Sequence, residues 1–541
     1  MGRTYADALT LLETLQSNRA IVSSISDSTR DLSQNAIPEM LDWTRKAGYN
    51  VEDFAKNGLK CIQVAGTKGK GSVCVMVENI LLQYQKELNG RSSNGLGKIG
   101  LYTSPHLVHV RERIRIDGCP ISETLFARYF FDIWDRFSDA ASKASHPDPT
   151  CAETKPGYFR YLTILAFHTF IEERVETAII ECGIGGEYDS TNILPPGAVT
   201  TSAITRLGID HTGMLGDTIE KIAWHKAGIM KPGVPTYTIE QVPEAQAALE
   251  ERAKEKGVEL IVTKRRPDLD NGTIKLGLDG DFQKDNASLA IAVAASHLTA
   301  LGITDQIPDP RELVPGASTL PEKFIRGVET VTWSGRWQVI KDGNTEWYID
   351  GAHTEDSIAA TAIWFRRAML SAMAEPKPPT ETMLIFNQQD RDAKSLLRKL
   401  LTVLHQRQKI VAVAPVLKEY VHPHHGLRRS RIHDLDEYMG KVLPQRIFTY
   451  AAFCTNTPFK HPEGEAVDVK LQTKLSKVYQ TYENNVLYMV YGSIEEAVAL
   501  ARKVSEGDER VLVLVTGSLH LVGGLLKIFE KEKADLNKVL S

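Results

Sequence analysis

The residues whose types and spacing most clearly suggest chemistry form a turn rich in glycine and lysine at 64–72, Val-Ala-Gly-Thr-Lys-Gly-Lys-Gly-Ser. A short apolar run at 61–64 indicates a buried strand, and residues 73–88 carry apolar side chains at helical spacing. In a strand–turn–helix of this kind, glycines let backbone amides approach phosphates, the helix N-terminus adds a partial positive charge, and Lys70 adds a full one. The sequence therefore predicts a nucleotide phosphate site at this turn.

The turn departs from the standard phosphate-loop pattern at two places. Counted back from Lys70, the position of the usual first glycine holds Val64. The residue after the lysine is Gly71, and the hydroxyl comes one residue later, at Ser72. A glycine-rich turn without a ligand is the alternative, but the strand and the helix on either side favour nucleotide binding.

Length and composition exclude several classes of protein. A chain of 541 residues predicts two to four domains, and a net charge of -4 gives no reason to expect nucleic acid as a partner. The sequence has no run of about 18 apolar residues, so we expect no integral membrane segment. The N-terminus lacks the apolar core of a secretory signal. The six cysteines are scattered without CxxC pairs, so we expect reduced thiols and no zinc site.

Strands that alternate with helices, each strand ending in polar residues, predict a parallel sheet with ligands at its carboxyl ends. The expected strands of the first region are 61–64, 98–103, 177–180 and 199–205. A second α/β pattern follows, with strands expected at 347–350, 383–386, 410–414 and 511–515. We therefore predict an α/β protein of two domains: a phosphate-loop domain with a mainly parallel sheet at 1–305, a linker at 306–333 that is rich in proline and polar residues, and a Rossmann-like domain at 334–541.

Polar residues follow several of the predicted strands of the first domain. Glu181 ends a buried strand, where a carboxylate can bind a magnesium ion that bridges nucleotide phosphates; an acid that caps the next loop is the alternative. Ser104 and His211 follow two other strands, although serine is a common turn residue and a lone histidine is usually structural. By spacing alone, Lys226 is a solvated lysine on a helix at 218–228.

The second domain offers three further candidates. Arg336 lies near the domain junction, where a guanidinium can reach a phosphate held by the first domain. Asp350 and His353 follow a strand, although each taken singly is compatible with an ordinary surface loop. A histidine cluster at 422–425 lacks further ligands at useful spacing, so a solvated loop is favoured there.

Taken together, these stretches resemble the folylpolyglutamate synthases of the Mur-ligase-like family of ATP-dependent amide-forming ligases, in a eukaryotic form of fungal type. The resemblance covers nearly the whole chain. It rests on ordered motifs: GTKGKGS at 66–72, LYTSPHL at 101–107, RERIRIDG at 111–118, ECGIGGEYDSTNI at 181–193, the stretch 204–233, SGRWQ at 334–338, IDGAHT at 349–354 and TGSLHLVGG at 516–524.

The resemblance implies roles for residues at matching positions. It places ATP on Gly66, Thr67, Lys68, Gly69, Lys70, Gly71, Ser72, Asn286, Arg336 and Asp350. It places magnesium, at two sites, on Ser104, Glu181, His211 and Lys226, the last as a carbamate. It makes Lys70, Lys226, Asp350 and His353 the catalytic residues. No role is carried over to Glu187 or His225, where relatives have arginine and glutamate.

The activity implied is ATP-dependent addition of L-glutamate to the γ-carboxyl of tetrahydrofolate and its polyglutamates through an acyl phosphate, with release of ADP and phosphate. Dihydrofolate synthase, which does the same chemistry on dihydropteroate, is one alternative, and an ATP-dependent switch that forms no amide is another. The expected cofactors are ATP and Mg²⁺, with a monovalent cation such as K⁺. The expected partners are reduced folate, L-glutamate and ATP. We expect a monomer in the cytoplasm, and also in the mitochondrial matrix where an alternative start adds a targeting segment.

Overall fold

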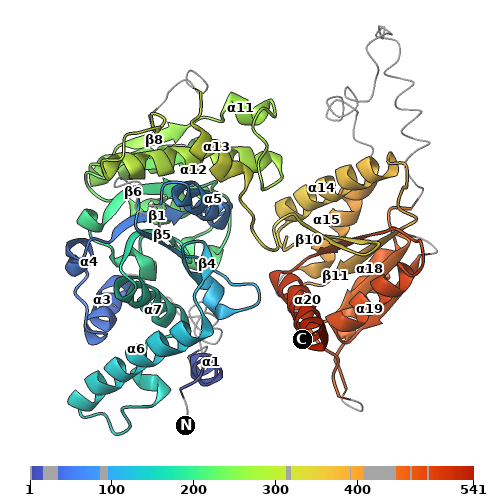
Figure 1. Ribbon diagram of the computed structural model, residues 1–541, viewed down its shortest axis with the longest axis horizontal. Helices are drawn as coiled ribbons and strands as arrows, with labels where there is room; N and C mark the ends of the chain where they lie inside the picture. The colour runs from blue at the N-terminus through green and yellow to red at the C-terminus, as the bar shows by residue number, and fades with distance from the viewer. Residues whose placement is uncertain are drawn as a thin grey trace. The chain divides into compact units, whose positions relative to one another are not determined.

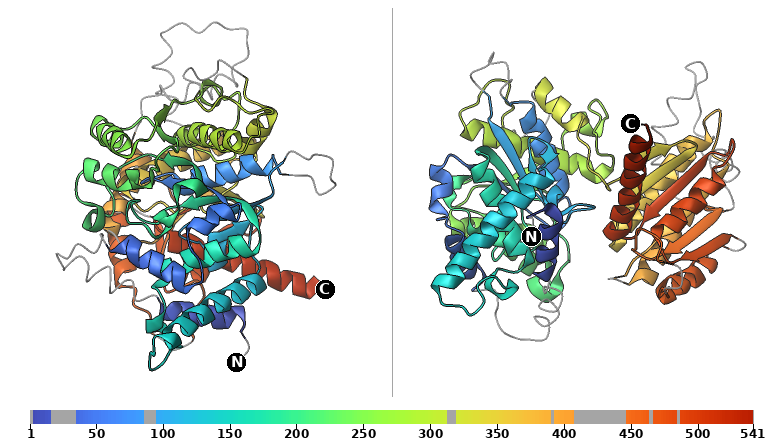
Figure 2. Two further views of the ribbon diagram at one scale, coloured as in Figure 1. Left: turned by 90° about the vertical axis from the view of Figure 1, so that its left-hand side faces the viewer. Right: turned by 60° about the horizontal axis from the view of Figure 1, so that its bottom comes forward.

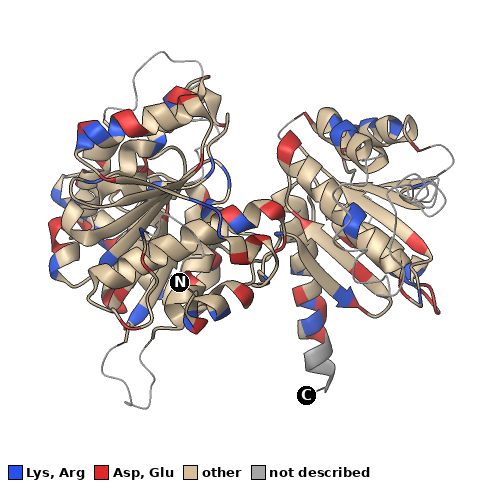
Figure 3. Cartoon of the chain, turned by 90° about the horizontal axis from the view of Figure 1, so that it is seen from above, with Lys and Arg blue, Asp and Glu red and all other residues tan. Residues whose placement is uncertain are grey.

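The computed structural model describes residues 3–15, 35–85, 95–311, 319–389, 392–406, 446–462, 466–483 and 486–540. The chain divides into two compact units, Met1–Trp333 and Ser334–Ser541 (Figure 1). The strand expected at 410–414 and the histidines at 422–425 lie outside the described residues. No described helix is long and apolar enough to cross a membrane. Basic and acidic residues are interspersed over the helices of both units (Figure 3).

Unit 1 is built on an eight-stranded sheet in the order β4-β3-β2-β5-β1-β6-β7-β8. Six of its strands run parallel, and β3 and β4 at one edge are antiparallel. The inner strand β1 is buried from its second residue onward, as expected for a parallel strand covered on both faces. The strands are β1 (Lys60–Ala65), β2 (Lys98–Tyr102), β3 (Ile114–Ile116), β4 (Cys119–Pro120), β5 (Val175–Glu181), β6 (Val199–Ile204), β7 (Thr236–Ile239) and β8 (Leu260–Thr263).

Helices cover both faces of this sheet (Figures 1 and 2). One hydrophobic core lies between the sheet and α1, α3, α6 and α7; another lies between the sheet and α5, α12 and α13. The helices among the described residues of unit 1 are α1 (Tyr5–Thr14), α3 (Ala36–Lys46), α4 (Glu52–Lys56), α5 (Lys70–Leu82), α6 (Glu123–Lys143), α7 (Tyr158–Glu172), α8 (Thr212–Leu215), α9 (Ile219–Lys226), α10 (Pro243–Lys256), α11 (Pro267–Asp270), α12 (Asp281–Ala300) and α13 (Glu322–Glu329).

The segment expected as a linker, 306–333, contains the helix α13. This helix buries Phe324 and Val328 in the core that α5 and α12 share, so it belongs to unit 1. Its apolar residues are spaced for one buried face, but the prolines and polar residues around it mask that signal in the sequence.

The described strands of unit 2 form a six-stranded sheet in the order β13-β12-β11-β14-β10-β9, and among them β9 alone is antiparallel. The strands are β9 (Gln338–Asp342), β10 (Thr345–Asp350), β11 (Glu381–Phe386), β12 (Tyr450–Cys454), β13 (Leu487–Tyr491) and β14 (Val511–Thr516). The helices in the described part of this unit are α14 (Glu355–Met373), α15 (Ala393–His405), α18 (Lys470–Gln480), α19 (Ile494–Val504) and α20 (Leu519–Leu540). Two sheets that are mainly parallel, each with helices, confirm the predicted α/β class.

His297 on α12 makes the stability of unit 1 sensitive to acid. Its ring is fully buried between Thr200 Oγ1, 2.6 Å from Nδ1, and Thr177 Oγ1, 3.0 Å from Nε2. Burial lowers the pKa of His297 from 6.5 to about 3. Below pH 6.5 the unfolded chain therefore takes up a proton here that the folded chain does not, and the folded state loses roughly 1.4 kcal/mol per pH unit down to the lowered pKa.

We expect His297→Gln to flatten the fall in the free energy of unfolding between pH 6.5 and pH 4, measured by urea denaturation. The exposed His146→Gln is the matched control and should leave the pH slope unchanged. An unchanged slope in His297→Gln would show that the acid sensitivity arises elsewhere.

Candidate active site

The turn between β1 and α5 requires glycine at two positions. Gly66 and Gly69 have φ angles of +146° and +91°. A Cβ on Gly66 would lie 1.8 Å from Thr205 Oγ1, and one on Gly69 would lie 2.5 Å from Asn286 Oδ1. The turn is therefore pressed between the end of β6 and the start of α12, with no room for a side chain at either glycine.

Backbone contacts hold the first half of the turn, and its second half forms the start of α5. The amides of Thr67 and Lys68 each donate to Arg206 O at 3.1 Å, and Thr67 Oγ1 donates to Gly208 O at 3.0 Å. Gly69 is the N-cap residue of α5 and makes no side-chain cap hydrogen bond. The amides of the first helical turn are the donors that no α-helix satisfies internally, and with the helix dipole they favour an anion.

Two lysines point at the same carbonyl of the turn. Lys70 Nζ lies 3.2 Å from Gly66 O, and Lys226 Nζ lies 2.8 Å from it. Lys226 is 3% exposed, and burial, followed by the charge of Lys70, lowers the pKa of Lys226 from 10.5 to about 7. The sequence placed Lys226 on a solvated helix face; the structure places it inside, beside the phosphate loop.

Glu181 and Ser104 meet at the same end of the sheet. Glu181 is buried at the end of β5, and its Oε2 accepts a 2.9 Å hydrogen bond from the Ser104 amide, just beyond the neighbouring strand β2. A Cβ on Gly71 would lie 3.8 Å from Glu181 Oε2, so this carboxylate borders the start of α5. His211 follows β6, has a φ of 51°, and is 43% exposed at its side chain.

This donor set fits a magnesium ion shared with a nucleotide. Mg²⁺ in such sites takes one or two carboxylates and fills its remaining positions with phosphate oxygens and water. Glu181 supplies one buried carboxylate beside the anion site, and Ser104 supplies a hydroxyl. Among the described residues, no group of three or more His, Cys, Asp and Glu side chains forms a complete cation cage.

The start of α12 is bonded to the start of α5 through side-chain amides. Asn286 Nδ2 donates to Gln283 Oε1 at 2.8 Å, and Gln283 Nε2 lies 3.3 Å from Ser72 Oγ. The Asn286 carbonyl oxygen packs on Gly69. Asn286, expected near the nucleotide, thus contacts the phosphate loop, and Gln283 is a contact that sequence reasoning missed.

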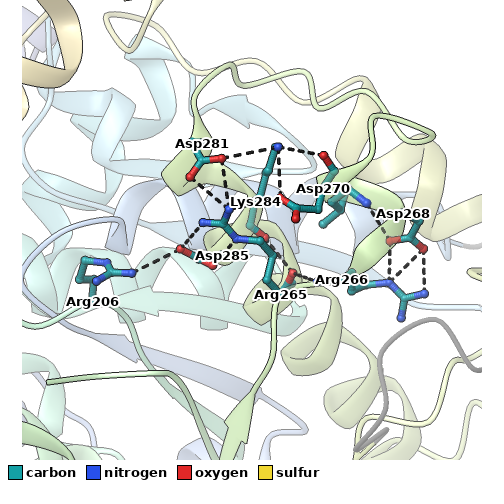
Figure 4. Close-up of polar contacts among 10 residues, drawn as sticks. Arg206, Arg265, Arg266, Asp268, Asp270, Asp281, Lys284 and Asp285 are labelled. Atoms are coloured by element: carbon teal, nitrogen blue, oxygen red, sulfur yellow. Dashed lines mark hydrogen bonds and ion pairs between the residues drawn. The ribbon is translucent and has the colours of Figure 1, made fainter. Parts of the chain in front are cut away.

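Ion pairs fix the same helix from its other side (Figure 4). Arg265 Nε and Nη2 lie 2.8 and 2.9 Å from the two carboxylate oxygens of Asp285, and Arg206 Nη2 lies 3.4 Å from Asp285. Arg206 is the residue whose carbonyl accepts the two amides of the phosphate loop. Arg265 also pairs with Asp281 at 3.1 Å. One network therefore links the start of α12 to the loop.

Glu187 and His225, the two positions to which no role was carried over from relatives, both have local partners. Glu187 Oε2 pairs with Arg252 at 2.7 Å and with Lys256 at 3.2 Å, both on α10. The Glu187 amide donates to His225 O at 2.7 Å, and burial lowers the pKa of His225. These contacts join the loop after β5 to α9 and α10.

In unit 2 the predicted residues gather at the carboxyl end of β10. Asp350 is buried and accepts from Thr361 Oγ1 at 2.7 Å and from the Trp337 amide at 3.2 Å. Burial raises the pKa of Asp350, and the nearby charge of Arg336 acts in the opposite direction. His353 Nδ1 lies 2.7 Å from Gly351 O. The carboxyl end of a parallel sheet is where α/β proteins bind ligands.

A phosphate loop on one α/β unit, followed by a second α/β unit with polar strand ends, is the architecture of a two-domain ATP-dependent ligase. No family model matches the chain. Folylpolyglutamate synthases of Saccharomyces cerevisiae strains are 39% identical to it over 545 residues, covering 98% of this chain and 88% of theirs. The chain belongs to the folylpolyglutamate synthase family, whose members are ADP-forming amide ligases.

Solved structures share the fold. The Mycobacterium tuberculosis folylpolyglutamate synthase complexed with ADP and AMPPCP has 20% identity and a TM-score of 0.59, covering 91% of this chain and 97% of its own. Escherichia coli FolC in complex with DHPP and ADP has 21% identity and a TM-score of 0.60, with 98% of both chains covered. The apo form of the L. casei enzyme has 20% identity and a TM-score of 0.61, covering 97% of this chain and 99% of its own.

We expect Gly69→Ala to weaken nucleotide binding beyond its effect on stability. Alanine at this positive φ costs roughly 1–2 kcal/mol of folding stability, and its Cβ also displaces the Asn286 amide. Gly58→Ala is a matched control, because Gly58 has a φ of +83° and no atom within 4 Å of the added Cβ. Both variants should lose the stability that the positive φ costs, and Gly69→Ala should lose more because its Cβ displaces the Asn286 amide, while only Gly69→Ala raises the Kd for Mg-ADP in calorimetry. Equal Kd values in the two variants would contradict the assignment.

Proposed function

We propose that this chain adds L-glutamate to the γ-carboxyl of tetrahydrofolate and its polyglutamates, using ATP and releasing ADP and phosphate. The observation that carries the proposal is the anion site at the start of α5, where Lys70, Lys226 and Glu181 converge. It lies in a chain 39% identical along nearly its whole length to the folylpolyglutamate synthases of yeast.

A carboxylate is a poor acyl donor because its negative charge repels nucleophiles and oxide is a poor leaving group. Transfer of the γ-phosphoryl group to the folate γ-carboxylate gives an acyl phosphate, and the bond to ADP breaks. The α-amine of glutamate then attacks the acyl carbon, loses a proton and displaces phosphate. The protein contributes mainly by positioning the groups and by offsetting the charge of the transferred phosphoryl group.

We assign each part of this chemistry to particular residues. The loop 66–72, which includes Lys70, holds the phosphates, and Asn286 lies near the adenine of the nucleotide. Ser104, Glu181, His211 and a carbamate of Lys226 are proposed to hold Mg²⁺, which when bound offsets phosphate charge. From unit 2, Arg336 and Asp350 are proposed to contact ATP, and His353 the reacting groups. A second magnesium site, the need for K⁺, the monomeric state and the cellular location stay predictions.

The lysine carbamate has a physical basis in this fold. Only a neutral amine reacts with CO₂, and the pKa of Lys226, lowered to about 7, makes that form abundant at neutral pH. The carbamate would turn a buried cation into an anionic oxygen ligand beside the phosphate loop.

Incorporation of labelled L-glutamate tests the proposal. Purified chain with Mg-ATP should extend tetrahydrofolate and release one ADP per glutamate added. Extension of dihydropteroate in its place would assign the chain as a dihydrofolate synthase. ADP release that needs neither glutamate nor folate would support the switch and overturn the ligase assignment.

A further inference from the structure

Residues 322–333, the return segment, run back along α5 toward the phosphate loop (Figure 1 draws α13 beside α5). Near the C-terminal end of α5, the Phe324 ring meets the Tyr84 ring edge-on, with centroids 5.8 Å apart. Asn79 lies five residues closer to the phosphate loop than Tyr84. Its Nδ2 donates to Gly327 O at 2.6 Å and to Thr330 Oγ1 at 3.0 Å. The segment thus follows α5 in the opposite direction.

Close backbone approaches fix this path. A Cβ on Gly327 would lie 2.7 Å from Ile80 Cα. On the other side, the Gly277 amide donates to Val328 O at 2.9 Å, and a Cβ on Gly277 would lie 2.2 Å from Val331 O. The return segment therefore has little room to shift along or away from α5.

Trp333, the last residue of unit 1, lies over the first turn of α5. A Cβ on Gly71 would lie 3.6 Å from Trp333 Nε1 and 3.8 Å from Glu181 Oε2. Gly71 directly follows Lys70, so the indole edge and the carboxylate border the same residue at the phosphate end of the helix.

A second set of contacts holds the indole from β3. The Arg115 guanidinium lies 5.6 Å from the centroid of the Trp333 ring. Arg115 also pairs at 3.2 Å with Glu78, which is 1% exposed on α5. Burial raises the pKa of Glu78 to about 7, and the charge of Arg115 opposes this shift. Trp333 is thus held by two elements that are themselves bonded to each other.

We propose that Trp333 is a positioning residue for the phosphate end of the nucleotide. It packs on Gly71 and fixes, relative to the start of α5, the point where the chain enters unit 2. Gly71 directly follows Lys70, so an indole fixed on Gly71 restricts movement of the phosphate end of α5. The proposal rests on the proposed function in one respect: the nucleotide that Trp333 positions is the ATP of the ligase reaction.

Steady-state kinetics separate positioning from folding. We expect Trp333→Ala to lower kcat/KM for ATP about 10-fold or more, with KM for folate unchanged. Trp333→Phe, which keeps an aromatic ring over Gly71, should stay within about 3-fold of wild type. Trp43→Ala is the matched control, because Trp43 packs edge-on against Phe137 in the core on the other face of the sheet. It should leave kcat/KM for ATP unchanged.

Tryptophan fluorescence gives a readout that does not depend on activity. Of the seven tryptophans, Trp333 is the one over Gly71. Titration with Mg-ADP should change the emission of the wild type and of Trp43→Phe, and this change should be lost in Trp333→Phe. Full retention of the change in Trp333→Phe, or wild-type kcat/KM in folded Trp333→Ala, would overturn the proposal. A chain that shows the signal but adds no glutamate would refute the proposed function alone.

Discussion

Replacement of Lys70 by alanine is expected to lower kcat for glutamate addition by roughly 100- to 1000-fold or more, while the chain stays folded. The reason is electrostatic: removal of one preorganised group that stabilises developing charge costs about this much in enzymes. The hydrogen bond from Lys70 to Gly66 O contributes about 1 kcal/mol to stability, so the free energy of unfolding should change little. Single-turnover assays with labelled glutamate measure the loss.

The control for this prediction is a lysine with a surface partner. Lys56 pairs with Asp53 one turn away at 3.0 Å and is 74% exposed, so Lys56→Ala removes the same charge far from the loop. Its turnover should equal that of wild type. Turnover above about a tenth of the wild-type rate in folded Lys70→Ala would refute the phosphate-loop assignment.

The sequence predicts the loop and the strand ends well because their signals are local. A buried strand, spaced glycines and a helix start lie within about twenty residues at 61–82, and each depends on short-range backbone geometry. Glu181 was found in the same way, from its place at the end of an apolar run. Residues of this kind can be placed without knowledge of the tertiary structure.

The contacts that fix α12 could not be predicted in this way. Gln283 reaches Ser72, 211 residues earlier in the chain, and Asp285 joins Arg206 and Arg265 from two other segments. On a helix these polar residues look like an ordinary solvated face. Only the packing of α12 against α5 brings Gln283 to the phosphate loop, and no periodicity in the sequence marks it.

The sequence around Lys226 contains a signal that its side chain is buried. It follows Ile222 by four residues and Ala223 by three, so all three lie on one helix face, and the structure buries all three. A lysine on the apolar face of a helix is a candidate for a perturbed amine. When the other residues on this helix face are considered together with the lysine, the sequence favours a buried Lys226 over a solvated one.

Replacement of Lys226 by methionine should therefore separate stability from activity. Its pKa falls from 10.5 to about 7, so between these values the unfolded chain holds a proton that the folded chain lacks. Stability contributed by this residue thus rises with pH from about 7, and near pH 7 the buried amine costs the folded state several kcal/mol at most. Lys226→Met removes that cost, and we expect an unfolding free energy at pH 7 equal to or above that of wild type.

The same variant should lose glutamate addition by roughly 100-fold or more, because it has no amine to form a magnesium-binding carbamate. Lys221→Met is the matched control: Lys221 lies on the same helix, is exposed, and pairs with Asp217 at 2.9 Å.

In wild type, CO₂-free buffer should lower activity and bicarbonate should restore it. Recovery should be faster at pH 8 than at pH 6, because a larger fraction of the Lys226 amine is neutral at pH 8. Native mass spectrometry should find one bound CO₂ in wild type and in Lys221→Met, and none in Lys226→Met. Activity that is indifferent to CO₂ in wild type would leave the amine itself, rather than its carbamate, as the acting group.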